Sequence, residues 1–288
     1  MSKTITYYNS GAVPLINASE LPYDVVNLAF LSSSSNNPFN LVLSGAIAAT
    51  ESSFTTNTIE AIKVMQHKGQ KVLISFGGGT MGSNAYRSLS EDTAKLADSL
   101  ASFVKNNQLD GVDIDYEDTA AFTGQAGYDG AQFLISLTQE LRKRLPSPDY
   151  IISHAPQPPY LEQGGYMAGY VEVVELVGQE IDWLNVQFYN NPPWSANPDQ
   201  IVSSYLNYTK LPNMSPEKVI AGFPVTQNDA GSGYMPVQTI INEVIKPIQQ
   251  QSSLGGIMNW QFSSDHNGDW IKAIAQSLNS LEHHHHHH

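Results

Sequence analysis

Short, nearly continuous apolar runs recur along this chain, a pattern typical of strands buried on both faces of a parallel sheet. Polar or glycine-rich segments separate them, such as the tract 32–38 and Gly77-Gly78-Gly79. The runs predict eight strands, at 5–8, 25–31, 71–76, 109–117, 150–155, 183–189, 219–223 and 256–260.

Apolar residues at helical spacing lie between most of these runs. Ile59, Ile62 and Met65 predict a helix before Gly69, and similar patterns predict helices around 96–104, 133–141 and 270–278. Eight strands alternating with helices over about 280 residues are the count of a single (β/α)8 TIM barrel, an α/β fold. No Pro- or Gly-rich linker divides the chain, so residues 1–280 are predicted to form one domain.

The composition narrows the possible partners. Residues 281–288 end in six histidines and are interpreted as an expression tag. The rest has 26 acidic and 14 basic residues, a formal net charge of −12, and no basic cluster. This acidity argues against nucleic acid or an anionic membrane and favours a neutral partner. Because no apolar run reaches about 18 residues, no membrane-spanning segment is expected.

The chain contains no cysteine, which excludes disulfides, a thiolate nucleophile and a Cys-based zinc site. This fits a reducing cytoplasm and a secreted microbial enzyme equally well. The first strand follows Met1 almost directly, so we expect any signal peptide to have been removed or never to have existed. We favour a secreted monomer and leave a cytoplasmic location open.

The fourth apolar run carries the candidate chemistry. Asp110, Asp113, Asp115 and Glu117 place four carboxylates in eight residues. Since side chains alternate along a strand, the last three share one face and the apolar residues between them share the other. Like charges on a buried face repel and lose hydration, so at least one should hold a proton at neutral pH. A solvated edge strand would not need the intervening apolar residues, and a calcium loop would need a different spacing.

In a (β/α)8 barrel the active site lies at the C-terminal ends of the strands. Each residue at such an end could by itself serve only to pack the core. Several of them, however, turn inward and are predicted to converge with Glu117 at the mouth of the barrel. They are Ser75, Gly77, Gln187, Tyr189 and Trp260.

Asp110-Gly111-x-Asp113-x-Asp115-x-Glu117 resembles the signature of glycoside hydrolase family 18, the chitinases and endo-β-N-acetylglucosaminidases. Tyr8 resembles the family's first-strand tyrosine, although Tyr7 beside it leaves the register open. Other segments resemble the family and its plant hevamine-like branch, namely Ser75-x-Gly77-Gly78, Ala155-Pro156-Gln157, Gln187-Phe188-Tyr189-Asn190 and Gly255-Gly256-Ile257-Met258-x-Trp260.

Two features that other members of the family carry are missing from this chain. It lacks the disulfides of the plant hevamines. The 32 residues between Phe223 and Gly256 leave no room for the α+β insertion that many family members carry. The active-site groove is therefore expected to be shallow and open, which favours cleavage within polymer chains.

The resemblance implies an endo-acting chitinase that retains the anomeric configuration through an oxazolinium ion formed by the substrate's own acetamide. Glu117 would be the general acid and then the base. Asp115 would hydrogen-bond the acetamide N–H, Asp113 would share a proton with Asp115, and Tyr189 would donate to the acetamide oxygen. No metal or cofactor is needed. The substrate-binding residues are expected to be Tyr8, Phe30, Ser75, Gly77, Gln187, Asn190 and Trp260.

The resemblance also predicts non-proline cis peptides after Ala29 and Trp260, and an indole floor under the reacting sugar at Trp260. Asp110 has the opposite parity from the other carboxylates and is assigned a structural role. His154 is interpreted as a packed, hydrogen-bonded residue.

Two alternatives stay open at this stage. An endo-β-N-acetylglucosaminidase acting on N-glycan cores uses the same chemistry. Barrels of this family that have lost catalysis act as lectins or inhibitors, but these usually change the acid or its aspartate partner. Here Glu117, Asp115, Asp113 and Tyr189 are all present, and the fifth and sixth strands favour chitin or chito-oligosaccharides.

Overall fold

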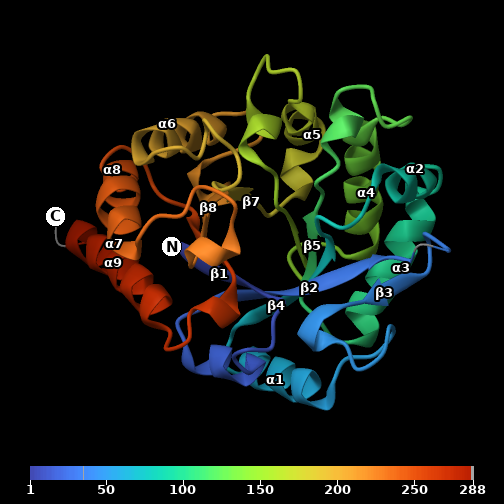
Figure 1. Cartoon of the computed structure of the whole chain (residues 1–288), viewed down its shortest axis with the longest axis horizontal. Helices are drawn as coiled ribbons and strands as arrows, with labels where there is room; N and C mark the ends of the chain where they lie inside the picture. The colour runs from blue at the N-terminus through green and yellow to red at the C-terminus, as the bar shows by residue number, and fades with distance from the viewer. Residues whose placement is uncertain (35, 287–288) are drawn as a thin grey trace.

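The computed structural model describes residues 1–34 and 36–286, and its parallel strands close into a barrel (Figure 1). Strand β1 pairs with both β9 and β2, which closes the ring. All eight strands correspond to predicted ones, so the single (β/α)8 TIM barrel is confirmed. They are β1 (Lys3–Tyr8), β2 (Val25–Ser33), β4 (Lys71–Gly77), β5 (Gly111–Asp115), β6 (Ile151–His154), β7 (Trp183–Gln187), β8 (Val219–Pro224) and β9 (Gly256–Trp260).

Helices surround the barrel, as Figure 1 shows in a view that looks into the ring. Those predicted from apolar spacing are present as α1, α3, α4 and α9. The α-helices are α1 (Thr56–His67), α2 (Ser83–Ser90), α3 (Thr93–Asn106), α4 (Gly130–Arg144), α5 (Gly169–Val177), α6 (Pro198–Tyr208), α7 (Val237–Ile240), α8 (Lys246–Gln249) and α9 (Asp269–His286).

Several connections differ from a regular strand–helix alternation. Between β1 and β2 there is only a 3₁₀ helix, η1 (Leu15–Glu20), and β3 (Leu41–Leu43) pairs antiparallel to the end of β2. The connection from β8 to β9 holds α7, a π-helical turn η8 (Ile241–Ile245) and α8, which leaves no α+β insertion in that segment. Helix α9 continues into the expected tag, 281–288, of which 287–288 lie outside the described residues.

Two apolar clusters hold the barrel together. Within each strand alternate residues face inward or outward, so Val25 and Ala29 belong to the cluster inside the barrel while Val26 and Leu28 pack against the helices. Four α-helices have an N-cap residue whose side chain accepts a hydrogen bond from the first turn. These caps are Thr55, Asp92, Asp129 and Asn197.

Aspartates join adjacent strands where the strands begin. Asp110 Oδ2 accepts hydrogen bonds from Val72 N at 2.8 Å and Gln66 Nε2 at 3.1 Å. Asp182 Oδ2 accepts from Ile152 N at 2.8 Å in the same way. These bonds satisfy strand N–H groups that have no ladder partner, so the structural role predicted for Asp110 is confirmed.

Arg142 ties helix α4 to the starts of β6 and β7. Its guanidinium donates to the carbonyl oxygens of Leu145, Tyr150 and Glu180 and, at 2.8 Å, to Asp182 Oδ2. The Arg142 side chain is 10% exposed and that of Asp182 is 31% exposed, so water could replace the guanidinium only in part. One side chain thereby satisfies three carbonyls and a carboxylate at the N-terminal end of the barrel.

We predict that Arg142→Ala lowers the free energy of unfolding by about 2–4 kcal/mol, because it leaves several partly buried acceptors unpaired. Arg142→Lys keeps the charge but not the planar fork and should fall between Ala and wild type. Urea unfolding measures the change. The control is Arg87→Ala, which removes an exposed arginine bonded to Asn84 and should change stability by less than about 0.5 kcal/mol. Equal stability of the two alanine variants would contradict this prediction.

Candidate active site

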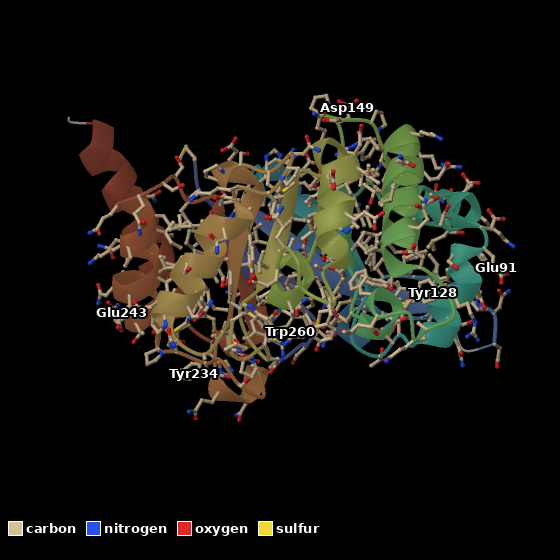
Figure 2. The ribbon with its side chains drawn as sticks, turned by 90° about the horizontal axis from the view of Figure 1, so that it is seen from above. Glu91, Tyr128, Asp149, Tyr234, Glu243 and Trp260 are labelled. Carbon is tan, nitrogen blue, oxygen red and sulfur yellow. The ribbon has the colours of Figure 1, made fainter. Side chains whose placement is uncertain are left out.

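The candidate site opens at the C-terminal ends of the strands. In Figure 2, Trp260 and Tyr234 lie at one end of the molecule and Asp149 at the opposite end. A cavity of about 180 Å³ opens there, and its lining has carboxylates but no Lys, Arg or His. It is lined by Tyr7, Phe30, Gly79, Asp115, Glu117, Gln187, Tyr189, Asn190, Asp229, Met258 and Trp260.

Asp113 lies at the base of the site, fully buried inside the barrel. Its Oδ2 accepts from Tyr7 Oη and Ser75 Oγ, each at 2.8 Å, and its Oδ1 from Ser153 Oγ at 2.7 Å and Asn185 Nδ2 at 3.4 Å. Burial raises the pKa of this carboxyl, although all four donors act in the opposite direction. Four strands therefore each contribute one donor to a single carboxyl.

Asp115 is the last residue of β5, and Glu117 follows just beyond the strand and faces the same cavity. Asp115 Oδ1 accepts from Gln187 Nε2 at 3.2 Å. Burial first, and then the charges of Glu117 and Asp113, raise the pKa of Asp115 well above its usual range. Burial also raises the pKa of Glu117, opposed by a hydrogen bond from Gln157. These shifts agree with the expectation that at least one of the three carboxyls is protonated at neutral pH.

The hydrogen bonds of Asp113 go to four other groups, and that of Asp115 goes to Gln187, so none joins the two carboxyls. The proton shared between these two residues stays a prediction. Tyr189 also lines the cavity, and burial raises the pKa of its hydroxyl well above the usual range. Tyr189 therefore keeps its proton and can act as a hydrogen-bond donor.

Aromatic rings form one wall of the cavity. The indole of Trp260 stacks on Phe30 with ring centroids 6.0 Å apart and approaches Tyr7 at 5.6 Å. The peptides Ala29–Phe30 and Trp260–Gln261 are both cis, as predicted. This wall offers an apolar face of the kind that packs against a sugar ring.

Asn190 holds a neighbouring loop at the mouth. It adopts a left-handed backbone conformation with φ of 60°, which asparagine tolerates better than most residues. Its Oδ1 accepts from Gly231 N at 2.6 Å and from Ser232 N at 3.2 Å. The side-chain oxygen is therefore engaged in fixing the loop after β8 beside Tyr189.

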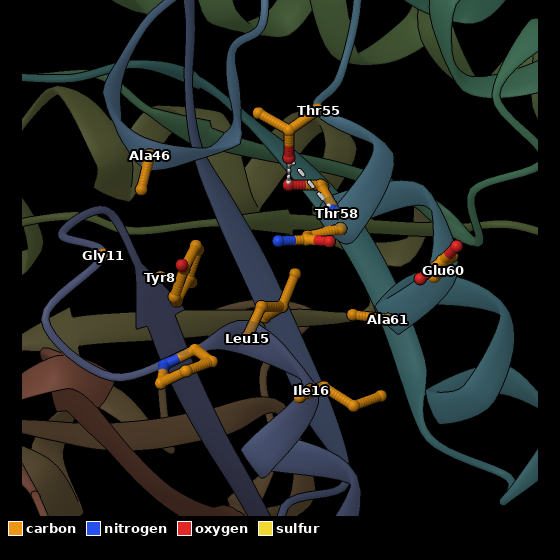
Figure 3. Close-up of a pocket in the computed structure, with 11 residues that line it drawn as sticks. Tyr8, Gly11, Leu15, Ile16, Ala46, Thr55, Thr58, Glu60 and Ala61 are labelled. Atoms are coloured by element: carbon orange, nitrogen blue, oxygen red, sulfur yellow. Dashed lines mark hydrogen bonds between the residues drawn. The ribbon is translucent and has the colours of Figure 1, made fainter.

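The position predicted for Tyr8 is wrong. Tyr8 points outward from β1 into a separate cavity of about 490 Å³ between the loop 11–16 and helix α1 (Figure 3). The preceding residue, Tyr7, turns into the barrel and donates to Asp113. The outer cavity is larger than the candidate site, but Glu60 is the single carboxylate in its lining, so the larger volume does not make it the catalytic site.

Ser75 and Gly77 also differ from their predicted role, since neither belongs to the lining of the cavity. Ser75 is fully buried and donates to Asp113. At Gly77, φ is +116° and a Cβ would lie 2.2 Å from the carbonyl oxygen of Asp115, so only glycine fits. These two residues support the carboxylates. The cavity does bring together Phe30, Gln187, Asn190 and Trp260 with Asp115, Glu117 and Tyr189.

Four lining residues were not among the predicted site residues: Tyr7, Gly79, Asp229 and Met258. Inward parity with Ile5 could have identified Tyr7. Asp229 comes from the loop after β8, where it accepts from Thr226 N at 2.8 Å and Ser264 Oγ at 2.7 Å. No periodicity in the sequence places that carboxylate at the mouth.

Among the described residues, no cluster of three or more His, Asp or Glu side chains is arranged to hold a metal ion, and no helix is long and apolar enough to span a membrane. His154 is fully buried, with Nδ1 2.9 Å from Tyr170 Oη and Nε2 3.1 Å from Thr138 Oγ1. Burial lowers the pKa of His154 to about 3. It is the packed histidine that was predicted.

We predict that Asp115→Asn raises the melting temperature relative to wild type, increasingly as the pH rises above the usual aspartate range. A carboxyl whose folded-state pKa is raised binds its proton more tightly in the folded protein. Its contribution to stability is therefore present at low pH and is lost as the pH rises toward the folded pKa. Thermal unfolding between pH 4 and 8 measures the effect. The exposed Asp149→Asn is the control, and a constant difference across this range would contradict the prediction.

The chain matches the family model described as "Glycosyl hydrolases family 18" over residues 3–234. It is 30% identical over 258 residues to an acidic endochitinase of Cucumis sativus, covering 87% of this chain and 82% of the relative. A basic endochitinase of Nicotiana tabacum is 28% identical over 266 residues, with coverages of 88% and 82%.

A solved structure, a GH18 chitinase from Pseudoalteromonas aurantia, is 98% identical to this chain and superposes with a TM-score of 0.94. It covers 96% of this chain and 100% of its own. The carboxylate row of β5 lies inside a barrel that these comparisons match along most of its length. The chain belongs to family 18 of the glycosyl hydrolases.

Proposed function

We propose that this protein is an endo-acting chitinase that hydrolyses β-1,4-linked N-acetylglucosamine polymers with retention of configuration. The observation that carries the proposal is one cavity in which Asp115, Glu117, Tyr189 and Trp260 converge above the buried Asp113. The endochitinase relatives and the 98% identical chitinase structure support chitin as the polymer.

Glu117 is the general acid in this proposal. A carboxyl must hold a proton at working pH to protonate a leaving glycosidic oxygen, and burial raises the pKa of Glu117 in that direction. The side chain lies in the cavity lining, where the scissile oxygen can reach it. After the leaving group departs, the same carboxylate accepts a proton from the attacking water.

The substrate's own acetamide is the proposed nucleophile. Asp115 lies two residues before Glu117 and faces the same cavity, whereas a covalent nucleophile must approach the sugar from the face opposite the acid. The acetamide oxygen can approach from there. Tyr189 donates to that oxygen, and Asp115 accepts from the acetamide N–H and balances the positive charge of the oxazolinium ion. Asp113 would share a proton with Asp115.

The short connection between β8 and β9 favours cleavage within chains. Residues 225–255 form loops, α7, η8 and α8, so no added domain walls the groove on that side. An open groove admits a polymer along its length without threading from an end. We also propose a secreted monomer, since a polymer of this size is met outside the cell.

Glu117→Gln should lower kcat on chito-oligosaccharides by about 10²- to 10⁴-fold, because the amide keeps the shape but cannot donate a proton of suitable acidity. KM should stay within a few-fold of wild type. Steady-state kinetics on N-acetylglucosamine oligomers measure both values. The exposed Glu91→Gln serves as control, and a loss of only a few-fold in Glu117→Gln would place the acid elsewhere.

Removing the acetyl group of the reacting sugar should abolish cleavage while leaving polymer binding. Fully deacetylated chitosan should therefore resist hydrolysis. Partly acetylated chitosan should give products whose new reducing end is always N-acetylglucosamine in the β-configuration. NMR and mass spectrometry of early products read both features. Efficient hydrolysis of the deacetylated polymer, or a trapped glycosyl–Asp115, would contradict substrate-assisted catalysis.

A further inference from the structure

The carboxyl of Glu117 is weakly held by its own contacts. In the described part of the chain its hydrogen-bond partner is Gln157 Nε2, at the long distance of 3.4 Å from Oε1. Gly79 lies against Oε2 and offers no side chain. A group with so little direct support owes its position to the backbone that carries it.

The next residue, Asp118, anchors that backbone. Its carboxylate turns away from the cavity and is 8% exposed. Oδ1 accepts from Ser83 Oγ at 2.8 Å and Oδ2 accepts from Tyr128 Oη at 2.7 Å. Ser83 opens helix α2 after β4, and Tyr128 lies in the loop before α4. One carboxylate therefore joins the end of β5 to two other segments at the mouth.

No ion pair compensates Asp118 among the described residues. A buried carboxylate without a cation loses hydration, and here two hydroxyl donors offset that loss. A neutral residue would avoid the desolvation altogether. The charge is a poor device for stability alone, which favours a role in fixing geometry.

The residues on either side of Glu117 and Asp118 are also tied down. Tyr116 Oη lies 2.5 Å from Tyr128 Oη, so the tyrosine that donates to Asp118 also forms a hydrogen bond with the residue before Glu117. Thr119 Oγ1 lies 2.5 Å from Tyr160 Oη, in the segment after β6. Glu117 is thus the residue of this turn whose side chain is left to face the cavity.

We propose that Asp118, held by Ser83 and Tyr128, is a positioning residue that sets the Glu117 carboxyl at the leaving glycosidic oxygen. The inference rests on the proposed function of Glu117 as general acid. Asp118 does not line the cavity, so it is not placed to contact a substrate there. It acts through the peptide that it shares with Glu117.

The test compares two leaving groups with the full-length protein. The leaving group of a chito-oligosaccharide is a weakly acidic sugar hydroxyl, which must be protonated as it departs. The leaving group of 4-nitrophenyl N,N′-diacetylchitobioside is an acidic phenol, which needs little protonation. We expect Asp118→Ala to lower kcat/KM on the oligosaccharide by about 10- to 100-fold, as for a misplaced catalytic group. On the aryl substrate kcat/KM should fall by less than about 3-fold, since its departure barely depends on the acid.

Asp118→Asn should recover most of the lost activity. Its Oδ1 can accept from Tyr128, and its Nδ2 can donate to Ser83 Oγ, whose hydroxyl hydrogen is then free to turn toward solvent. Tyr128→Phe removes one of the two donors and should shift the substrate ratio in the same direction as Asp118→Ala. If Asp118→Ala does not fold, the Tyr128→Phe variant alone can test the proposal.

The matched control is Asp129→Ala, next to Tyr128 in the chain, which removes the cap of α4 without touching the Glu117 segment. It should lower the melting temperature and leave the ratio of the two substrates unchanged. Equal losses on both substrates in Asp118→Ala or Tyr128→Phe would overturn the proposal. Inactivity of the wild type on chito-oligosaccharides would instead overturn the proposed function.

Discussion

The burial of one carboxyl group without a neighbouring cation constrains the interior of the whole barrel. Asp113 lies where a barrel of this size is ordinarily filled by apolar side chains. Burying it requires donors, and Tyr7, Ser75, Ser153 and Asn185 supply them from β1, β4, β6 and β7. Each of these strands gives up an apolar core position to serve the site, so the same hydrogen bonds that hold the site also fix the strands relative to one another.

The architecture could be predicted because a parallel barrel buries its strands on both faces. Apolar runs such as 25–31 and 183–189 can therefore be predicted as strands without knowing which strands lie beside them. The irregular connections could not be read in this way. The 3₁₀ helix η1 takes the place of a full helix between β1 and β2. In the connection from β8 to β9, the π-helical turn η8 separates α7 from α8. Both depend on how the chain packs against the finished barrel, which no local pattern encodes.

Strand parity placed the carboxylates correctly, but it could not settle depth or register. Ser75 has the right parity and lies one layer too deep to reach the cavity. Tyr7 and Tyr8 are adjacent and chemically alike, so a one-residue slip exchanged the inner residue for the outer one. Asp118 and Asp229 come from loops, where position follows from tertiary contacts alone.

The closure of the ring between its first and last strands has a consequence for the order of folding. Thr6 Oγ1 donates a hydrogen bond to Asn259 Oδ1, 253 residues later in the sequence. The rings of Tyr7 and Trp260 are in contact across the same sequence separation. During synthesis β1 leaves the ribosome long before β9, so the nascent sheet keeps an open edge for most of translation. The aromatic wall formed by Phe30 and Trp260 is therefore completed last, and a chain released early would expose strand edges without having gained a site.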